Sequence, residues 1–199
     1  ISCGAEAVKK KTDGTWETVW RRDPEGDHTL DFARIALGEP MINARIFSRN
    51  LFLERGGFDI TFGLAADRKF LLQLAQENPK ARSLDLMLYR YRWHEGSRTM
   101  TEGNKLSAQL TLENLRIAES FLSGSLSSIE REAVRAWHRK QSVQLAMMEL
   151  ERAGPSGFLR AAVRGTSVSA RWPSAFAAEF FRCLPGFLAR GCRTRSQVA

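Results

Sequence analysis

The amino-acid sequence predicts an α/β layer structure followed by an α-helical extension. Up to about residue 101, short strand-like segments alternate with segments of helical periodicity. Beyond that point the apolar residues recur at helical spacing alone. The last segment, 155–199, is basic and carries an aromatic stripe. We therefore expect three parts, with the bounds 1–101, 102–154 and 155–199.

The first element expected is a β-hairpin. Residues 2–10 and 15–20 are strand-like, and the dipeptide Asp13-Gly14 lies between them. This dipeptide is favoured in tight hairpin turns because both central positions need positive φ. The two segments should therefore pair as antiparallel neighbours.

Alternating helices and strands should complete the first part. A helix capped by Asp27 or Thr29 should run to Leu37, where Gly38 and Pro40 end it. The following segments are expected to be a strand at 41–47, a helix at 48–55 ended by two glycines, a helix at 65–77, and a strand at 84–93.

The second part should be a pair of antiparallel helices packed beside the α/β body. Two apolar stripes at helical spacing predict them, and the breaks fall at Gly124-Ser125 and Gly154-Pro155. The first stripe is Leu106, Leu110, Ile117 and Phe121; the second is Ile129, Val134, Trp137, Leu145 and Met148.

Composition excludes several classes of protein. No run of about 18 apolar residues predicts a spanning helix, and the first eleven residues do not read as a signal peptide. The motifs of serine hydrolases, zinc proteases and P-loop enzymes are absent. The three cysteines are scattered without a CxxC pair, which is typical of free thiols.

Four motifs follow one another between residues 43 and 99. They are N-A-R-I-F-S-R at 43–49, G-G-F-D at 56–59, A-A-D-R at 65–68 and Y-R-W-H-E-G-S-R-T at 91–99. In order and spacing this series resembles the second half of family 2 glycosyltransferases, over roughly residues 1–101. The resemblance implies a partial GT-A fold and an inverting, hexosyltransferase-like enzyme. The substrates implied are a nucleotide-sugar donor and a glycan or lipid-linked acceptor, in the synthesis of cell-surface polysaccharide.

The chain departs from the family in two ways. The family's amino-terminal nucleotide-binding half has no counterpart here, and neither has its Asp-x-Asp motif for a divalent metal, Mg²⁺ or Mn²⁺. We therefore expect these 199 residues to be a fragment that is inactive alone. The family also often has Glu before the Asp that opens the third motif's helix, where this chain has Ala66.

Asp67 is the candidate catalytic residue. By the resemblance, it is the base that takes a proton from the acceptor hydroxyl. At the start of a helix, backbone N–H groups and the helix dipole should fix its position and lower its pKa. The alternative is that Asp67 only caps the helix at 65–77, which is an ordinary role for aspartate.

The other candidate site residues have structural alternatives as well. By the resemblance, His94 is the candidate ligand for the metal or the diphosphate, flanked by Arg92 and Arg98; the alternative is a surface histidine at a strand end. The acceptor could be lined by Asn43 and Arg45, or these two could pair within the sheet. Among the aromatic residues Trp93 is the best candidate for stacking on a sugar, although strand aromatics usually pack in cores.

The tail, 155–199, has two interpretations. It holds seven arginines and one acid out of a chain with net charge +8. Its aromatic stripe suits a helix lying in a membrane interface, and equally a helix docked on its own domain. The stripe is Trp172, Phe176, Phe180, Leu184 and Phe187. With a lipid-linked acceptor, the first interpretation would place a cytoplasmic enzyme at the inner face of the plasma membrane. A non-catalytic helical module whose basic tail binds nucleic acid or membrane is the alternative function; on the glycosyltransferase hypothesis no nucleic-acid partner is expected.

Overall fold

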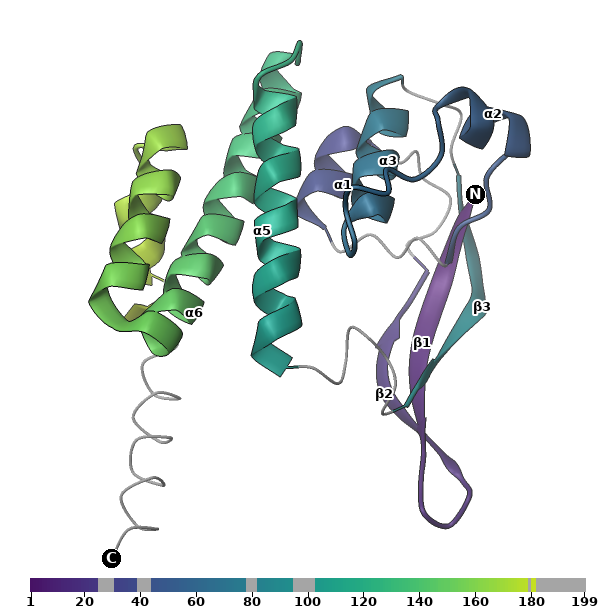
Figure 1. The fold of residues 1–199 in the computed structure, drawn as a ribbon. Coiled ribbons are helices and arrows are strands. Elements are labelled where there is room, and N and C mark those ends of the chain that lie inside the picture. Colours follow the sequence, from purple (N-terminus) through teal and green to yellow (C-terminus); the bar gives the residue numbers. More distant parts are fainter. Residues whose placement is uncertain (25–30, 39–43, 78–81, 95–102, 179, 182–199) are drawn as a thin grey trace, which may run out of the picture. The chain divides into compact units, whose positions relative to one another are not determined.

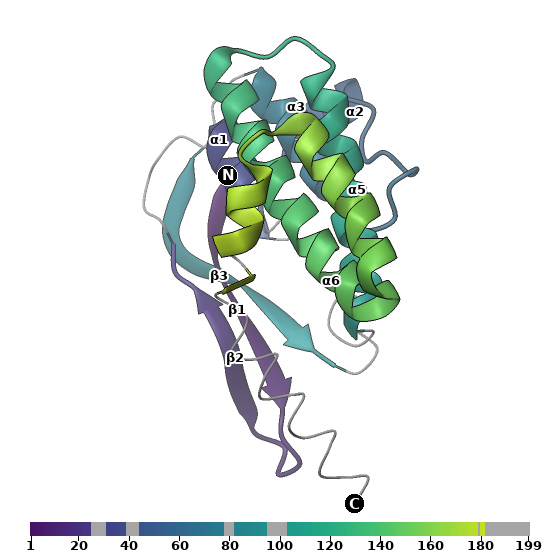
Figure 2. The ribbon, with the colours of Figure 1, turned by 90° about the vertical axis from the view of Figure 1, so that its left-hand side faces the viewer.

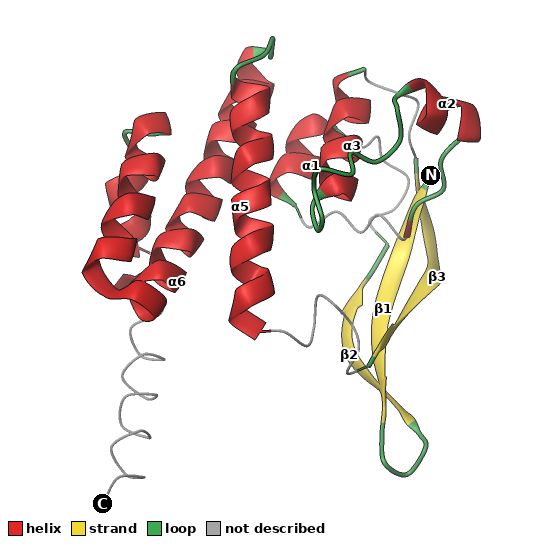
Figure 3. Ribbon diagram, viewed as in Figure 1, coloured by secondary structure: helices red, strands yellow, loops and turns green. Residues whose placement is uncertain are grey.

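A computed structural model describes residues 1–24, 31–38, 44–77, 82–94, 103–178 and 180–181 (Figure 1). The chain divides into two compact units, Ile1–Val134 and Arg135–Ala199. The first unit contains a sheet and several helices, so the α/β class expected for this part is confirmed (Figure 3). The second unit is helical in the part that is described.

Three strands form one sheet in the order β2-β1-β3. The strands are β1 (Ser2–Lys10), β2 (Trp16–Arg22) and β3 (Ser83–Trp93). β1 and β2 are antiparallel, as the hairpin prediction requires, and Gly14 in the turn has φ 85°. β1 and β3 are parallel, with the helices of the first unit between them in sequence. The central strand is therefore the most buried.

Helix α1 (Phe32–Leu37) starts later than expected. Its cap is Asp31, whose Oδ1 accepts the backbone N–H of Arg34 at 2.6 Å. The expected caps Asp27 and Thr29 lie outside the described residues. The helix ends at Gly38, as predicted, and Phe32 is buried.

The strand expected at 41–47 does not form in its described part. From residue 44 onward this segment makes a single antiparallel bridge, between Arg45 and Ser2. Ile1 and Ile46 add two backbone hydrogen bonds of 3.0 and 2.9 Å beside the bridge. The segment then turns into α2, so it is too short for a strand. Residues 41–43 lie outside the description.

Helices α2 (Arg49–Glu54) and α3 (Ala66–Gln76) form as predicted. Gly56 and Gly57 end α2 with φ of 73° and 69°. Phe58 is 43% exposed, yet its ring packs edge-on against other phenylalanines. The rings of Phe47, Phe52, Phe58 and Phe70 form this cluster, which joins α2 and its flanks to α3.

Helices α5 (Gly103–Leu122) and α6 (Ser128–Val168) confirm the two long helical segments. Ser127 and Glu130 cap α6 reciprocally, through bonds of 2.9 and 3.3 Å. Gly154, with φ 66°, interrupts α6 where the break was expected. Ile129 was wrongly assigned to the buried stripe, because it lies in the first turn and is 75% exposed.

Two tryptophans of the second unit are buried. Trp137 and Trp172 are 1% and 3% exposed. Trp172 opens a final helical segment, 172–178, and its Nε1 donates to Ser142 Oγ at 2.9 Å. Its ring stacks on Phe176 and lies near Phe158, so the described part of the tail's aromatic stripe packs within its own unit. Leu184 and Phe187 of that stripe lie outside the described residues.

Candidate functional site

The candidate site is centred on the first turn of α3. Ala65 occupies the N-cap position and has no side chain that could cap the helix. Asp67 lies two residues further on and is partly buried. The backbone N–H groups before and within this turn therefore need acceptors from elsewhere.

Glu113 on α5 supplies those acceptors for the loop before α3. Its carboxylate accepts the N–H groups of Gly63, Leu64 and Ala65 at 3.2, 2.8 and 2.9 Å. Gln109, one turn earlier on α5, donates to the same carboxylate at 3.0 Å. Burial acts to raise the pKa of Glu113, which is 6% exposed, but these donors outweigh it and the pKa is lowered. Glu113 is thus an ionised clamp that holds the loop in place.

The pKa of Asp67 is shifted in the direction opposite to that of Glu113. Burial is the largest influence and raises its pKa above the ordinary value. The N–H and the guanidinium of Arg68 act in the other direction, the N–H through a 2.6 Å bond to Oδ1. The sequence-based expectation of a lowered pKa was therefore wrong, because desolvation outweighs the hydrogen bonds at the helix start.

Two features of Asp67 suit a base rather than a cap. Its Oδ2 accepts no hydrogen bond from another described residue, so one oxygen is left for a substrate proton. A carboxylate with a raised pKa is also a stronger base than an ordinary aspartate. Asp67 does accept one N–H of the helix, so part of the capping role remains.

Asp59 of the G-G-F-D motif fixes the loop on its other side. Its Oδ1 accepts the N–H and the hydroxyl of Thr61 at 3.0 and 2.6 Å, which forms a local turn. Its Oδ2 pairs with Lys69 on α3. The Lys69 ammonium and the Thr61 donors hold the pKa of Asp59 down at about 2. Both ends of the 59–65 loop are therefore tied by carboxylates.

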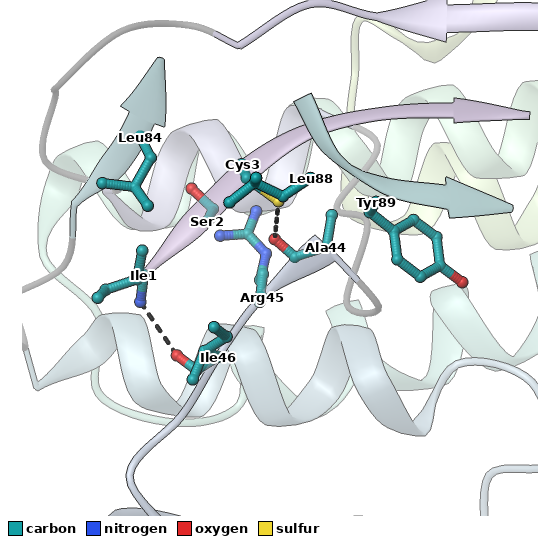
Figure 4. A pocket seen from close by; sticks show the side chains of 9 residues that line it. All are labelled: Ile1, Ser2, Cys3, Ala44, Arg45, Ile46, Leu84, Leu88 and Tyr89. Carbon is teal, nitrogen blue, oxygen red and sulfur yellow. Dashed lines mark hydrogen bonds between the residues drawn. The ribbon is translucent and has the colours of Figure 1, made fainter. Parts of the chain in front are cut away.

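Arg45 lies in a small pocket of about 130 Å³ between the start of β1 and the start of β3 (Figure 4). Figure 4 shows its guanidinium pointing toward Ser2 and Cys3, and Cys3 Sγ donating to the Ala44 carbonyl at 3.4 Å. Apolar side chains line most of the rest: Ile1, Ile46, Leu84, Leu88, with Tyr89 at one end. Arg45 also bridges to Ser2 through the backbone, so the sheet-pairing alternative holds for its main chain. Asn43 lies outside the described residues.

Arg92, Trp93 and His94 lie at the carboxyl end of β3. Arg92 and His94 are exposed, and Trp93 is partly buried opposite Lys9 of β1. Arg98 lies outside the description. In the described part of the chain, no group of three or more His, Cys, Asp or Glu side chains could hold a metal ion. The assignment of His94 as a ligand stays a prediction, and the described residues do not by themselves form a metal site.

The structure thus distributes the predicted site residues over three places. Asp67 lies at the start of α3, Arg45 beside the start of β1, and Arg92, Trp93 and His94 at the end of β3. Glu113 was missed by sequence reasoning because it is 48 residues from Ala65. Its only sequence signal is that an acidic residue lies between Leu110 and Ile117 of the apolar stripe.

Comparison with known proteins gives no match to a family model, to a curated protein or to a solved structure. None of the helices in the described residues is sufficiently long and apolar to cross a membrane.

Proposed function

We propose that the chain is the acceptor-side part of an inverting, family 2 type glycosyltransferase with a GT-A fold. The four ordered motifs support this proposal. The parallel pairing of β1 with β3, with α3 between them in sequence, is compatible with part of such a layered α/β fold. In this proposal the donor is a nucleotide sugar and the acceptor a glycan or a lipid-linked glycan.

The observation that carries the proposal is the environment of Asp67. Glu113 holds the loop before α3, so the helix start does not depend on Asp67 alone. Burial raises the pKa of Asp67, and its Oδ2 accepts no bond from another described residue. A carboxylate that only caps backbone N–H groups would be expected to have a lowered pKa, because the donors favour its charged form, as they do for Asp59.

The chemistry assigned to this chain is proton removal. Asp67 Oδ2 takes the proton of the acceptor hydroxyl as that oxygen attacks the anomeric carbon, and the bond to the diphosphate breaks. A divalent cation, when bound in enzymes of this class, stabilises the charge on the departing diphosphate. Arg68 stays on the helix beside the base, with Nη2 donating to the Gly38 carbonyl at 3.3 Å, and keeps the side of α3 tied to the end of α1.

The test is the variant Asp67→Asn in the enzyme that includes its nucleotide-binding part. The amide keeps the shape of the side chain and removes the proton acceptor. Transfer should fall by about 10²- to 10⁴-fold, while donor binding and the melting temperature are maintained. Asp59→Asn is the matched control, since it removes a carboxylate from the same loop and should leave most of the turnover intact at neutral pH. Near-normal transfer by Asp67→Asn would show that Asp67 is a cap.

A further inference from the structure

The β1–β2 hairpin extends beyond the helices of its unit in both ribbon views (Figures 1 and 2). Every residue from Lys9 to Val19 is exposed. The hairpin plays no part in the proposed transfer reaction, and exposed hairpin loops often carry a contact surface.

The side chains of the sheet are sorted by face. Cross-strand partners share a face, and successive residues alternate between faces. Lys10 is opposite Trp16, Val8 is opposite both Thr18 and Arg92, and Glu6 is opposite both Arg21 and Arg90. These residues therefore form one face of the sheet, which we call the basic face: Glu6, Val8, Lys10, Trp16, Thr18, Arg21, Arg90 and Arg92.

The two cations nearest the hairpin turn on the basic face are unpaired. Glu6 forms an ion pair with Arg90 at 2.6 Å, and Arg21 forms one with Asp23 at 2.6 Å. Neither Lys10 nor Arg92 forms an ion pair with any residue that the structure describes. Lys10 lies beside Trp16 across the β1–β2 pair, and Arg92 lies on the other edge strand, opposite Val8.

Trp16 is the apolar element of the same face. Its side chain is 49% exposed and makes no ring contact with another described residue. An exposed indole beside a cationic side chain is typical of the boundary between water and lipid, where its ring is buried and its N–H remains hydrated. Lys and Arg beside it can reach the head groups while their methylene stems lie along the ring.

We propose that the basic face of the hairpin binds the surface of an anionic bilayer. Lys10 and Arg92 attract the negative lipid head groups, and Trp16 enters the interface beside Lys10. The alternative polyanion, nucleic acid, would engage a longer row of cations, and on this face Arg21 and Arg90 are already paired with carboxylates. The tail is a poorer candidate in its described part, because Trp172 is buried within its own unit.

The experiment measures co-sedimentation of the full chain with phosphatidylcholine vesicles, with and without phosphatidylglycerol. Binding to the anionic vesicles should weaken about fivefold for each of Lys10→Gln and Arg92→Gln, and binding should fade as salt is added. Trp16→Ala should remove the part of the binding that survives high salt, and Trp16→Phe should keep most of it.

Lys9→Gln is the matched control. It removes the same charge one residue away, but Lys9 lies opposite Glu17 and Trp93 in the strand register, on the other face of the sheet. That places it about a Debye length further from the lipid at ~0.1 M salt, so its loss should weaken binding less than twofold. Thermal unfolding of each variant would show that the fold is kept.

Four outcomes would overturn the proposal. The first is no binding of the full chain to anionic vesicles. The second is an equal loss from Lys9→Gln and Lys10→Gln, which would mean that net charge and not the basic face is responsible. The third is binding that disappears when residues 182–199 are removed but is unchanged by Lys10→Gln and Trp16→Ala, which would assign the contact to the tail. A duplex DNA that binds as tightly as the vesicles, with the same dependence on Trp16 and Lys10, would also contradict it.

Discussion

Asp67 and Asp59 lie eight positions apart in the sequence, and their pKa values are shifted in opposite directions. Burial raises the pKa of Asp67, whereas Lys69 and Thr61 hold the pKa of Asp59 at about 2. Both are aspartates near the start of α3, so the difference comes from what surrounds each carboxylate. Asp67 accepts one backbone N–H from Arg68, and burial is the largest influence on its pKa. Asp59 accepts three donors, two from Thr61 and one from Lys69.

The raised pKa of Asp67 predicts how stability depends on pH. Its folded pKa lies above its unfolded value, so the folded state binds the proton more tightly. The contribution of Asp67 to stability should therefore fall as pH rises from the ordinary value of 3.8 through the folded pKa. Asp67→Asn has no such proton, so at pH 7 it should melt no lower than the parent. Thermal unfolding from acid to neutral pH measures this; a variant that melts lower at pH 7 alone would contradict it.

Asp59 should show the reverse dependence. Its folded pKa of about 2 lies below the unfolded value, so its contribution is present at neutral pH and is lost as pH falls through about 2. Asp59→Asn should therefore lower the melting temperature at pH 7 and have little effect near pH 2. The two variants together form an internal control, since a general effect of removing a carboxylate would have one sign at both positions.

At the scale of elements, the carboxylate of Glu113 connects α5 to the loop before α3. Glu113 accepts three backbone N–H groups from Gly63 to Ala65 and a fourth donor from Gln109. Hydrogen bonds to a buried charged group are the ones whose loss is costly. The clamp fixes the position from which α3 starts, and so the place of Asp67.

Glu113→Gln should therefore destabilise the chain by about 2–3 kcal/mol, since the amide keeps one acceptor oxygen and introduces an unmatched donor. Urea denaturation measures the loss. Hydrogen exchange at the amides of Gly63, Leu64 and Ala65 should accelerate at the same time. Glu132→Gln, an exposed glutamate on α6, is the control and should change stability by less than about 0.5 kcal/mol. Unchanged exchange at 63–65 would show that the loop is held by other contacts.

Elements with a strong local signal were predictable from the sequence. The hairpin has Asp13-Gly14, α3 and α5 have their apolar stripes, and α6 has its break at Gly154. Asp31 was missed as a cap because Asp27 and Thr29 offer the same chemistry nearby. The clamp by Glu113 joins segments about fifty residues apart, and the pKa of Asp67 depends on its burial in the folded chain. Local sequence patterns carry no information about either. The motif series could place Asp67 on a helix start, but not determine its protonation.

At the scale of the whole molecule, the two units differ in how they are held together. The first combines the sheet with helices through a phenylalanine cluster and the Glu113 clamp. The second depends on the final helical segment folding back on α6, through Trp172 and its partners. A side chain at Gly165 would collide with the Trp172 ring, so the two segments are in close contact. The basic tail is therefore, in its described part, a structural element of its unit.

The last prediction follows from this contact. Trp172→Ala should destabilise the second unit by about 3–5 kcal/mol, because it removes a large buried ring and leaves Ser142 without its donor. Phe181→Ala is the matched control, since Phe181 lies in the same tail but is 68% exposed, and its loss should cost little. Thermal unfolding followed by near-ultraviolet circular dichroism would report the loss of packing around the tryptophans. If Trp172→Ala instead left stability unchanged and reduced binding to anionic vesicles, the aromatic stripe of the tail would face lipid, and the internal packing of Trp172 would have no energetic importance in solution.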